Sequence, residues 1–428
     1  MDVTFVPIPG LHIADYVIIA IFLCICMGIG VYYGYQTNKN PSLENYFFGN
    51  RRLMIAPVTL SLFVTFISAI AIMGIPADIY KYGIPIIFGG AAYSLSIIIA
   101  SLTIVPLLYP LKLTSTYEVF YMGIALFAPA LALQTVAGIP LWLSIVVIGL
   151  VCTIYTAIGG IRSVVWTDVF QCLIVFTGIL AVIIKGRTLL GTRQSITEIA
   201  TEGHRLDFFD FDPSPMVRHT TWGLTIGMTF VMLPNWCNQA SVQRFSSLRS
   251  LNSAYKAFCL LIPVIVVFHV IIGYLGILIY SYYNTLRCDP VTGGFISNFN
   301  QIVPYFVLDV LRSLPGLSGV FISCLFSGAL STLSSGINAL SANTVEDILG
   351  DYVKKSKLIS QTLVAKLFVI TYGLLVIGLA YGINSMSGSI IQMAGVVFGA
   401  CGGPLLGLYF LGRMIPKANS TVSDCRSS

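Results

Sequence analysis

Charged residues are scarce in this sequence, where Asp, Glu, Lys and Arg together make up 9% of the 428 residues. An ordinary soluble domain carries about 25% charged residues, so this chain lacks the polar material that covers a water-facing surface. Segments of about ten residues with alternating hydrophobicity, the pattern of a transmembrane β-barrel, are also missing. The two absences together leave membrane-spanning helices as the expected architecture.

Catalytic and metal-binding signatures are missing as well. The sequence contains no GxSxG, P-loop or HExxH motif and no pair of carboxylates in a segment able to form a pocket. Its ten cysteines are scattered without metal-ligand spacing, and of its four histidines His269 stands alone in an apolar segment, which favours a packing role. We therefore expect no enzyme, no cofactor and no structural metal. The lack of a basic stripe with interleaved aromatic residues argues against a nucleic-acid partner.

Long apolar runs are what the sequence does contain, and 56% of its residues are hydrophobic. Each run is close to the ~20 residues that a helix needs to cross the hydrocarbon core, so we expect an all-α integral membrane protein. The first run lacks a basic leading region and a small-residue cleavage site, which predicts a retained span and not a signal peptide. The eleven expected segments are Ile13–Tyr33, Ile55–Ile75, Ile84–Tyr109, Phe120–Ala137, Leu141–Ile158, Val164–Ile184, Trp222–Cys237, Phe258–Tyr280, Leu317–Ala342, Thr362–Gly382 and Ser389–Leu411.

Positive charge is distributed unevenly over the loops between these segments. If the N-terminus lies outside and the loops alternate, 15 of the 23 lysines and arginines fall on the inner side. Cytoplasmic loops carry an excess of Lys and Arg, so we expect an outside N-terminus and a cytoplasmic C-terminus. The expected location is the plasma membrane. No separate soluble domain is visible. We expect one transmembrane domain over residues 1–417 and a short atypical cytoplasmic tail over residues 418–428.

Two of the segments carry residues that interrupt helices. The second contains Ser68 and Gly74 around an Ala-Ile-Ala-Ile core, and the seventh contains Pro234, followed by amide side chains such as Asn238. Non-helical backbone at membrane depth is tolerated only where it is buried in protein or lines a cavity, which would indicate a binding site. An ordinary proline kink or a glycine packing contact explains the same residues, and both interpretations stay open.

The ninth segment carries hydroxyl side chains on one face. The residues that share or flank this face on a 3.6-residue period are Ser327, Gly328, Ser331, Thr332, Ser334 and Ser335. Such a face permits close packing and hydrogen bonds between helices, which needs no ligand. Hydroxyl and carbonyl oxygens are also the ligands of a hard cation, so an ion site is the alternative interpretation.

Asp168 is one of the few charged residues near membrane depth, at the inner end of the sixth segment. An ionisable group at this depth suggests an ion path. The alternative is a carboxylate that caps the start of a helix near the cytoplasmic interface.

Five stretches of the sequence match the motifs of a known family. They are GNRRL to MGIPADIYKYG (Gly49–Gly83), YTAIGGIRSVVWTDVFQ (Tyr155–Gln171), NQASVQRF (Asn238–Phe245), SGALSTLSSGINALSANTVEDIL (Ser327–Leu349) and GGPLLGLYFLG (Gly402–Gly412). Together they resemble the sodium:solute symporter family from about Leu11 to Lys417. The branch that carries monocarboxylates, iodide and water-soluble vitamins is more similar than the sugar branch.

The resemblance implies a transporter core of two inverted halves of five helices each, preceded by one extra N-terminal helix. Solute is expected at the midplane beside the breaks in the second and seventh segments, with alternating access by rocking of the two halves. The implied function is symport of sodium with a small organic anion, such as a monocarboxylate or a water-soluble vitamin. Sodium is the implied coupling ion, and no other cofactor is implied.

The resemblance also carries over a set of site residues, position by position. The implied sodium ligands are the backbone carbonyls of Val64, Ile67 and Gly328 and the hydroxyls of Ser331 and Thr332. Asp168 matches an acidic residue linked to the inner sodium path. The implied residues lining the solute site are Ser68, Ala71 and Trp222, and Ala71 stands where some anion carriers have an amide.

The chain departs from the family pattern in two places. After Glu118 roughly twenty-five residues are missing, which leaves the fourth segment shorter than the ~20 residues of a full span. After MIPKAN (Met414–Asn419) the sequence changes to STVSDCRSS, and the later C-terminal helices of the family are missing. These departures raise a second hypothesis, a non-transporting variant that binds a partner or is inactive.

Overall fold

A computed structural model describes most of the chain. Its described residues are 11–39, 41–111, 118–191, 195–214, 216–296, 299–345, 349, 360–383, 396 and 398–414. The expected tail at 418–428 and residues 389–395 of the expected eleventh segment lie outside this set.

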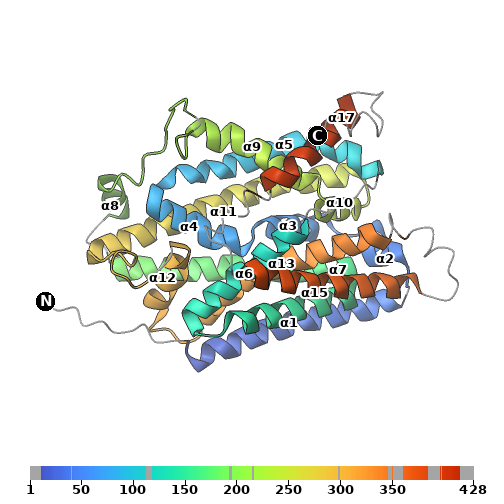
Figure 1. Cartoon of the computed structure of the whole chain (residues 1–428), viewed down its shortest axis with the longest axis horizontal. Helices are drawn as coiled ribbons and strands as arrows, with labels where there is room; N and C mark the ends of the chain where they lie inside the picture. Colours follow the sequence, from blue (N-terminus) through green and yellow to red (C-terminus); the bar gives the residue numbers. More distant parts are fainter. Residues whose placement is uncertain are drawn as a thin grey trace.

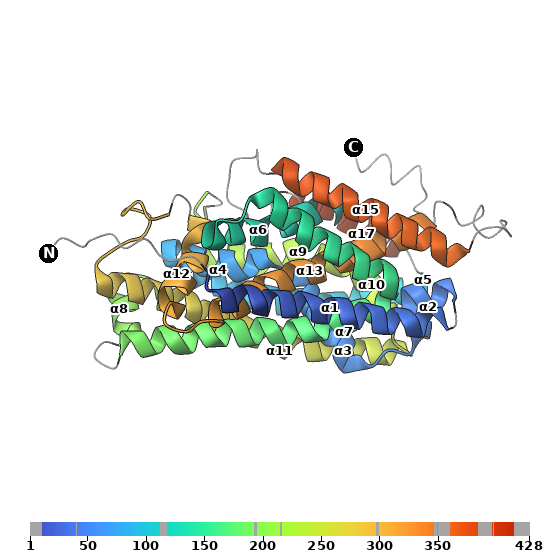
Figure 2. The ribbon, with the colours of Figure 1, turned by 90° about the horizontal axis from the view of Figure 1, so that it is seen from below.

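Helices make up all regular structure in the described ranges, as the all-α prediction requires. The α-helices are α1 (Ile13–Asn38), α2 (Leu43–Phe48), α3 (Ile55–Phe66), α4 (Ala69–Tyr82), α5 (Phe88–Leu111), α6 (Glu118–Ala137), α7 (Leu141–Leu190), α8 (Ile196–Glu202), α9 (Met228–Met232), α10 (Gln239–Ser246), α11 (Leu251–Leu286), α12 (Ile302–Leu311), α13 (Leu317–Asn343), α15 (Gln361–Ile383) and α17 (Gly403–Met414). Short π or 3-10 turns include η3 (Gly223–Gly227), η4 (Leu233–Trp236) and η7 (Phe398–Gly402). Most long helices run along one direction, with α8 and α12 at one end and α2 and α10 at the other (Figures 1 and 2).

Six helices in the described ranges are long and apolar enough to cross a membrane, or seven if α3 and α4 form one bent span. α7 is 50 residues long and consists of two helices that meet at Gly160, whose φ is 61°. A β-carbon on Gly160 would lie 2.6 Å from the carbonyl oxygen of Tyr46, so only glycine allows this approach of α2. The hydroxyl of Tyr46 donates to the carbonyl of Ala157 at 3.1 Å and satisfies a helix end that the kink leaves open. The fifth and sixth expected segments are these two halves of α7.

α13 forms the centre of the bundle. Of its most apolar window 94% is buried inside the protein, and it packs against both α7 and α1. The carboxylate of Asp15 on α1 accepts hydrogen bonds from the amides of Gly316 and Gly319, both at 2.9 Å. An acidic group at a helix N-terminus compensates free amides and the helix dipole. The extra N-terminal helix is therefore fixed to the helix that carries the hydroxyl face.

α6 corresponds to the fourth expected segment. The helix covers 20 residues, but its apolar stretch Tyr121–Gln134 is shorter than a full span. Residues 112–117, where the gap in the family pattern is expected, lie outside the described set. The shortened fourth span stays a prediction.

Candidate functional site

The first interruption lies inside the second apolar segment, where α3 and α4 meet at an angle of 57°. Ile67 and Ser68 have non-helical backbone between the two helices. The carbonyl of Ser68 accepts the amide of Ala71 at 3.0 Å, so α4 starts immediately after the break. A break of this kind leaves carbonyls at the end of α3 and amides at the start of α4 without helical partners, and a ligand can use both.

The second interruption lies in the seventh segment, between α9 and α10. Pro234 has no amide hydrogen, and the chain passes through η4 before α10 begins. The side chain of Asn238 accepts the amide of Ser241 at 2.9 Å, and the hydroxyl of Ser241 donates to the carbonyl of Asn235 at 2.6 Å. Polar residues after the proline therefore satisfy backbone groups that the break frees. Both interruptions predicted from the sequence are present.

The hydroxyl face of α13 packs against the first interruption. A β-carbon on Gly328 would lie 2.7 Å from the amide nitrogen of Ala69 and 3.1 Å from the carbonyl oxygen of Ile67. The hydroxyl of Thr332 lies 2.9 Å from the carbonyl oxygen of Thr65 on α3 and 3.0 Å from that of Gly328. Because Gly328 has no side chain, the backbone of α13 packs directly against the C-terminal end of α3. We call this contact the α13 seam.

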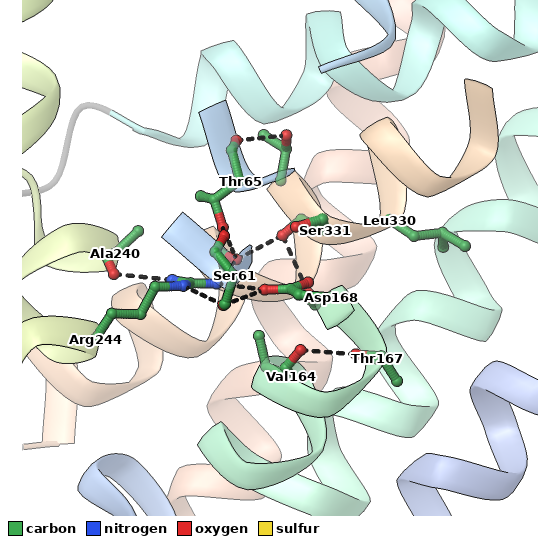
Figure 3. Close-up of polar contacts among 12 residues, drawn as sticks. Ser61, Thr65, Val164, Thr167, Asp168, Ala240, Arg244, Leu330 and Ser331 are labelled. Carbon is green, nitrogen blue, oxygen red and sulfur yellow. Dashed lines mark hydrogen bonds and ion pairs between the residues drawn. The ribbon is translucent and has the colours of Figure 1, made fainter. Parts of the chain in front are cut away.

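The α13 seam brings together most of the oxygens expected from the sequence as sodium ligands. Ile67, Gly328 and Thr332 meet there, and Val64 is fully buried one turn before Ile67. The hydroxyl of Ser331 is fully buried and faces the carboxylate of Asp168 (Figure 3). A hydroxyl that donates to a carboxylate keeps its oxygen lone pairs free to coordinate a cation. The candidate ion ligands are neutral carbonyl and hydroxyl oxygens, which fits a monovalent hard cation.

Asp168 forms a buried ion pair close to the same seam (Figure 3). Its Oδ2 atom lies 3.0 Å from Nη2 of Arg244 on α10, and the hydroxyl of Ser61 on α3 donates to it at 2.5 Å. Arg244 also donates to Ser61 at 2.7 Å and to Ser335 on α13. We call Ser61, Asp168, Arg244 and Ser335 the Arg244 network; all four are buried to within 1%. It joins α3 and α7 to α10 and α13.

A cavity of about 200 Å³ lies beside the first interruption. Ser68 and Ala71, both expected in the solute site, line it. Trp222 does not line it: its side chain is 53% exposed, and its ring lies 5.7 Å from that of Phe211. Trp222 precedes η3 at the surface of the bundle, which explains why it points away from the cavity.

The cavity contains polar groups that the sequence analysis did not assign to the solute site. His269 of α11, Tyr93 of α5 and Tyr121 of α6 line it together with apolar side chains. Nδ1 of His269 lies 2.9 Å from the carbonyl oxygen of Ile265, which can only accept, so Nδ1 carries a proton. The sequence analysis favoured a packing role for His269, but its side chain also lines the cavity. The adjacent glycines Gly89 and Gly90 could have indicated this site, because glycine leaves room for a side chain of a neighbouring helix. A β-carbon on Gly90 would lie 2.8 Å from the imidazole of His269.

The sequence is similar to that of a known protein family. The family model described as "Sodium:solute symporter family" matches residues 46–116 and 114–422. The Sodium-dependent multivitamin transporter of Oryctolagus cuniculus is 38% identical, with 95% of this chain and 67% of that protein covered. The Sodium-coupled monocarboxylate transporter 1 of Homo sapiens is 37% identical, with 95% and 70% covered.

A solved structure shares the fold. A substrate-bound, outward-open Na⁺-coupled sialic acid symporter superposes with a TM-score of 0.83 at 24% identity, covering 96% of this chain and 89% of that chain. This likeness confirms the predicted transporter fold.

Proposed function

The chain belongs to the sodium:solute symporter family, and from this premise we propose that it couples the entry of sodium to the transport of a small organic anion. The observation that carries the proposal is the α13 seam, where neutral oxygens meet a broken helix beside a small cavity. Broken helices at the interface of two halves are the usual place for solute and coupling ion in such carriers. An integral membrane protein with this arrangement works by alternating access.

Sodium is proposed to bind in the α13 seam, with the carbonyls of Val64, Ile67 and Gly328 and the hydroxyls of Ser331 and Thr332 as ligands. The fully buried hydroxyl of Ser331 and the contact of Gly328 with Ile67 support this assignment. One sodium ion moving down about 100 mV releases about 2.3 kcal/mol, before its concentration gradient is added. That energy suits the uphill transport of a monovalent anion.

The solute is proposed to be a short monocarboxylate in preference to a larger vitamin. The cavity of about 200 Å³ is smaller than the 300–1,000 Å³ typical of pockets for drug-sized ligands. No Lys or Arg lines it in the described part of the chain, so a carboxylate would rely on hydroxyls, the amides at the start of α4 and the adjacent sodium. Ser68, Tyr121 and His269 supply the polar contacts, and the remaining wall suits a short apolar chain.

Asp168 is proposed to lie on the path by which sodium leaves. Its carboxylate is paired with Arg244, so a departing cation competes with a guanidinium for the same oxygens. The end of the bundle with α2 and α10 is assigned to the cytoplasm. This end carries Arg51, Arg52, Arg162 and Arg249, while Lys81, Arg205 and Arg218 lie toward the opposite end.

The test is radiolabelled uptake in cells that express the chain, with surface expression measured in parallel. The panel contains lactate, nicotinate, iodide, biotin and pantothenate, each with and without external sodium. We expect sodium-dependent accumulation of lactate or nicotinate. Ser331→Ala and Thr332→Ala should each raise the half-saturating sodium concentration about tenfold, since each removes one ion ligand worth about 1.4 kcal/mol.

Ser327→Ala is the matched control for this test. The hydroxyl of Ser327 lies on the same helix but donates only to the carbonyl of Ser323 within α13, at 2.8 Å. Sodium dependence should be unchanged in this variant. If Ser331→Ala and Thr332→Ala behave like Ser327→Ala, the ion is bound elsewhere.

A second candidate function is a non-transporting variant that binds a partner. The observation that favours it is the family match, which is split into two parts that meet at residues 114–116, close to the expected gap. Surface expression without uptake of any solute on the panel would support this candidate. Insertion of the missing segment should then restore uptake.

A further inference from the structure

A second cavity, of about 210 Å³, lies at the end of the bundle that carries α2. It shares no lining residue with the solute cavity. It forms where α1 ends, α3 begins and α7 continues after its kink. Arg52 and Arg162 line it, together with the rings of Tyr33 and Trp166 and apolar side chains such as Met54. No acidic side chain is part of its wall.

Neither arginine has an anionic partner in the described part of the chain. The neighbouring Arg51 lies 3.7 Å from the carboxylate of Glu44, whereas Arg52 and Arg162 form no ion pair. Nη2 of Arg162 donates to the carbonyl of Gly49 at 3.3 Å, but its Nε is buried without a hydrogen-bond partner. A buried guanidinium N–H without an acceptor is costly, and two cations on one cavity repel each other. An anion in the cavity would relieve both costs.

The chemistry of the two side chains favours a phosphate group. Each guanidinium is planar, permanently charged and able to donate two parallel hydrogen bonds to a phosphate or a carboxylate. Two of them on one wall supply more donors and more charge than a single carboxylate needs. A phosphate monoester, with three free oxygens and a charge between about −1.5 and −2 at neutral pH, satisfies the pair.

The surroundings indicate a position at the membrane surface. The rings of Tyr33 and Trp166 lie parallel at 6.1 Å, and Trp and Tyr are enriched at the interface between lipid and water. Met54 is 60% exposed, so the cavity has an apolar rim that an acyl chain or a glycerol backbone can contact. Basic pockets between membrane helices on the cytoplasmic side bind anionic headgroups.

We propose that the cavity between Arg52 and Arg162 binds a terminal phosphate group, which either an anionic lipid headgroup or free phosphate can supply. Bound phosphate joins two segments that matter for transport. Arg52 precedes α3, whose far end is the first interruption, and Arg162 follows the kink of α7 by two residues. Occupancy therefore fixes the entrance of α3 against the second half of α7, which carries Asp168. The site is independent of which solute is carried.

The test measures the melting temperature of the purified full chain and its lipid binding by native mass spectrometry. The protein is reconstituted in phosphatidylcholine, in phosphatidylcholine with phosphatidic acid, and in phosphatidylcholine with inorganic phosphate in the buffer. We expect phosphatidic acid to raise the melting temperature and to remain bound. Arg52→Gln and Arg162→Gln should each weaken that binding about tenfold, because each removes a charge-assisted contact.

Arg51→Gln is the matched control, since Arg51 is the adjacent arginine and already has Glu44 as its partner. Arg162→Lys tests whether the planar guanidinium is needed, because lysine keeps the positive charge but cannot donate two parallel hydrogen bonds. Arg52 is exposed, so Arg52→Gln keeps the test valid if Arg162→Gln does not fold. Stabilisation by inorganic phosphate alone would assign the site to a free anion. Equal loss of binding in Arg51→Gln and Arg52→Gln, or no response to either phosphate source, would overturn the proposal.

Discussion

Two ion-pair clusters lie on opposite sides of the break in the second segment, and they differ in their contact with water. The Arg244 network contains Asp168 and Arg244, whose side chains are both 0% exposed. The second cluster, which we call the Asp78 cluster, lies at the far end of α4. There Asp78, 9% exposed, lies 3.0 Å from Arg218, which is 56% exposed, and 2.9 Å from His219.

Both groups connect the first half of the transporter to the second. Asp168 and Asp78 belong to the first half, and Arg244 and Arg218 lie in or just before the second half. The Arg244 network is fully buried, so its charges have lost their hydration and are stabilised by their attraction to each other. Water reaches the Asp78 cluster, where the same attraction is weak and easily replaced. The two sides of the break in the second segment are therefore held by ion pairs of very different strength.

The largest effect is expected when the Arg244 network is broken. Arg244→Gln leaves the Asp168 carboxylate buried without a cation, and removal of one partner of a buried pair costs about 3–5 kcal/mol. We expect a large fall in the melting temperature of the purified chain and loss of sodium-dependent uptake. The melting temperature and surface expression are the measurements.

The double variant Asp168→Asn with Arg244→Gln is the control for this prediction. It removes both charges and keeps side chains of similar size, so it should recover a large part of the lost stability. Uptake should stay impaired if Asp168 lies on the sodium path. A double variant that is no more stable than Arg244→Gln would show that the charges are not the cause.

A smaller effect is expected at the α13 seam, which lies between the two clusters. Gly328→Ala places a β-carbon 2.7 Å from the amide nitrogen of Ala69, and backbone cannot move aside as a flexible side chain would. Overpacking of this kind costs about 1–3 kcal/mol. The added methyl group should also raise the half-saturating sodium concentration. Gly378→Ala on α15 is the control, since no atom of the described residues lies within 4 Å of its β-carbon, and it should behave like the unchanged chain.

The sequence predicted the interruptions and the hydroxyl face because both are local properties. Pro234 removes a donor wherever it stands, and the period of α13 places Ser331 near Ser335 without reference to any other helix. The partner of Asp168 could not be predicted in this way. Arg244 is 76 residues away, on a short helix whose direction depends on the second interruption. The sequence therefore left two interpretations of Asp168 open, an ion path and a helix cap, and did not predict the ion pair with Arg244.

The cavity shows the same limit of prediction. His269 reads as a packing residue because its own helix is apolar, and only the glycines of α5 opposite it open the space that its ring faces. Trp222 was expected in the cavity because the family resemblance carried over a solute-lining position to it. The turn η3 follows Trp222 directly, and the side chain stays at the surface. Residue type and spacing predict an element; the direction of a side chain depends on where that element packs.

The smallest effect is expected at the exposed side of the Asp78 cluster. Arg218→Gln removes a half-exposed partner, and exposed pairs contribute roughly 0–1 kcal/mol. The difference in melting temperature should be measurable at low ionic strength and should vanish in 1 M choline chloride, where the screening length is about 3 Å. Choline is used because sodium itself would stabilise the protein by binding. The destabilisation by Arg244→Gln should persist in the same salt, because no screening ion reaches a fully buried pair. A salt-sensitive Arg244→Gln would mean that water enters the Arg244 network, and the two clusters would then differ in position and not in hydration.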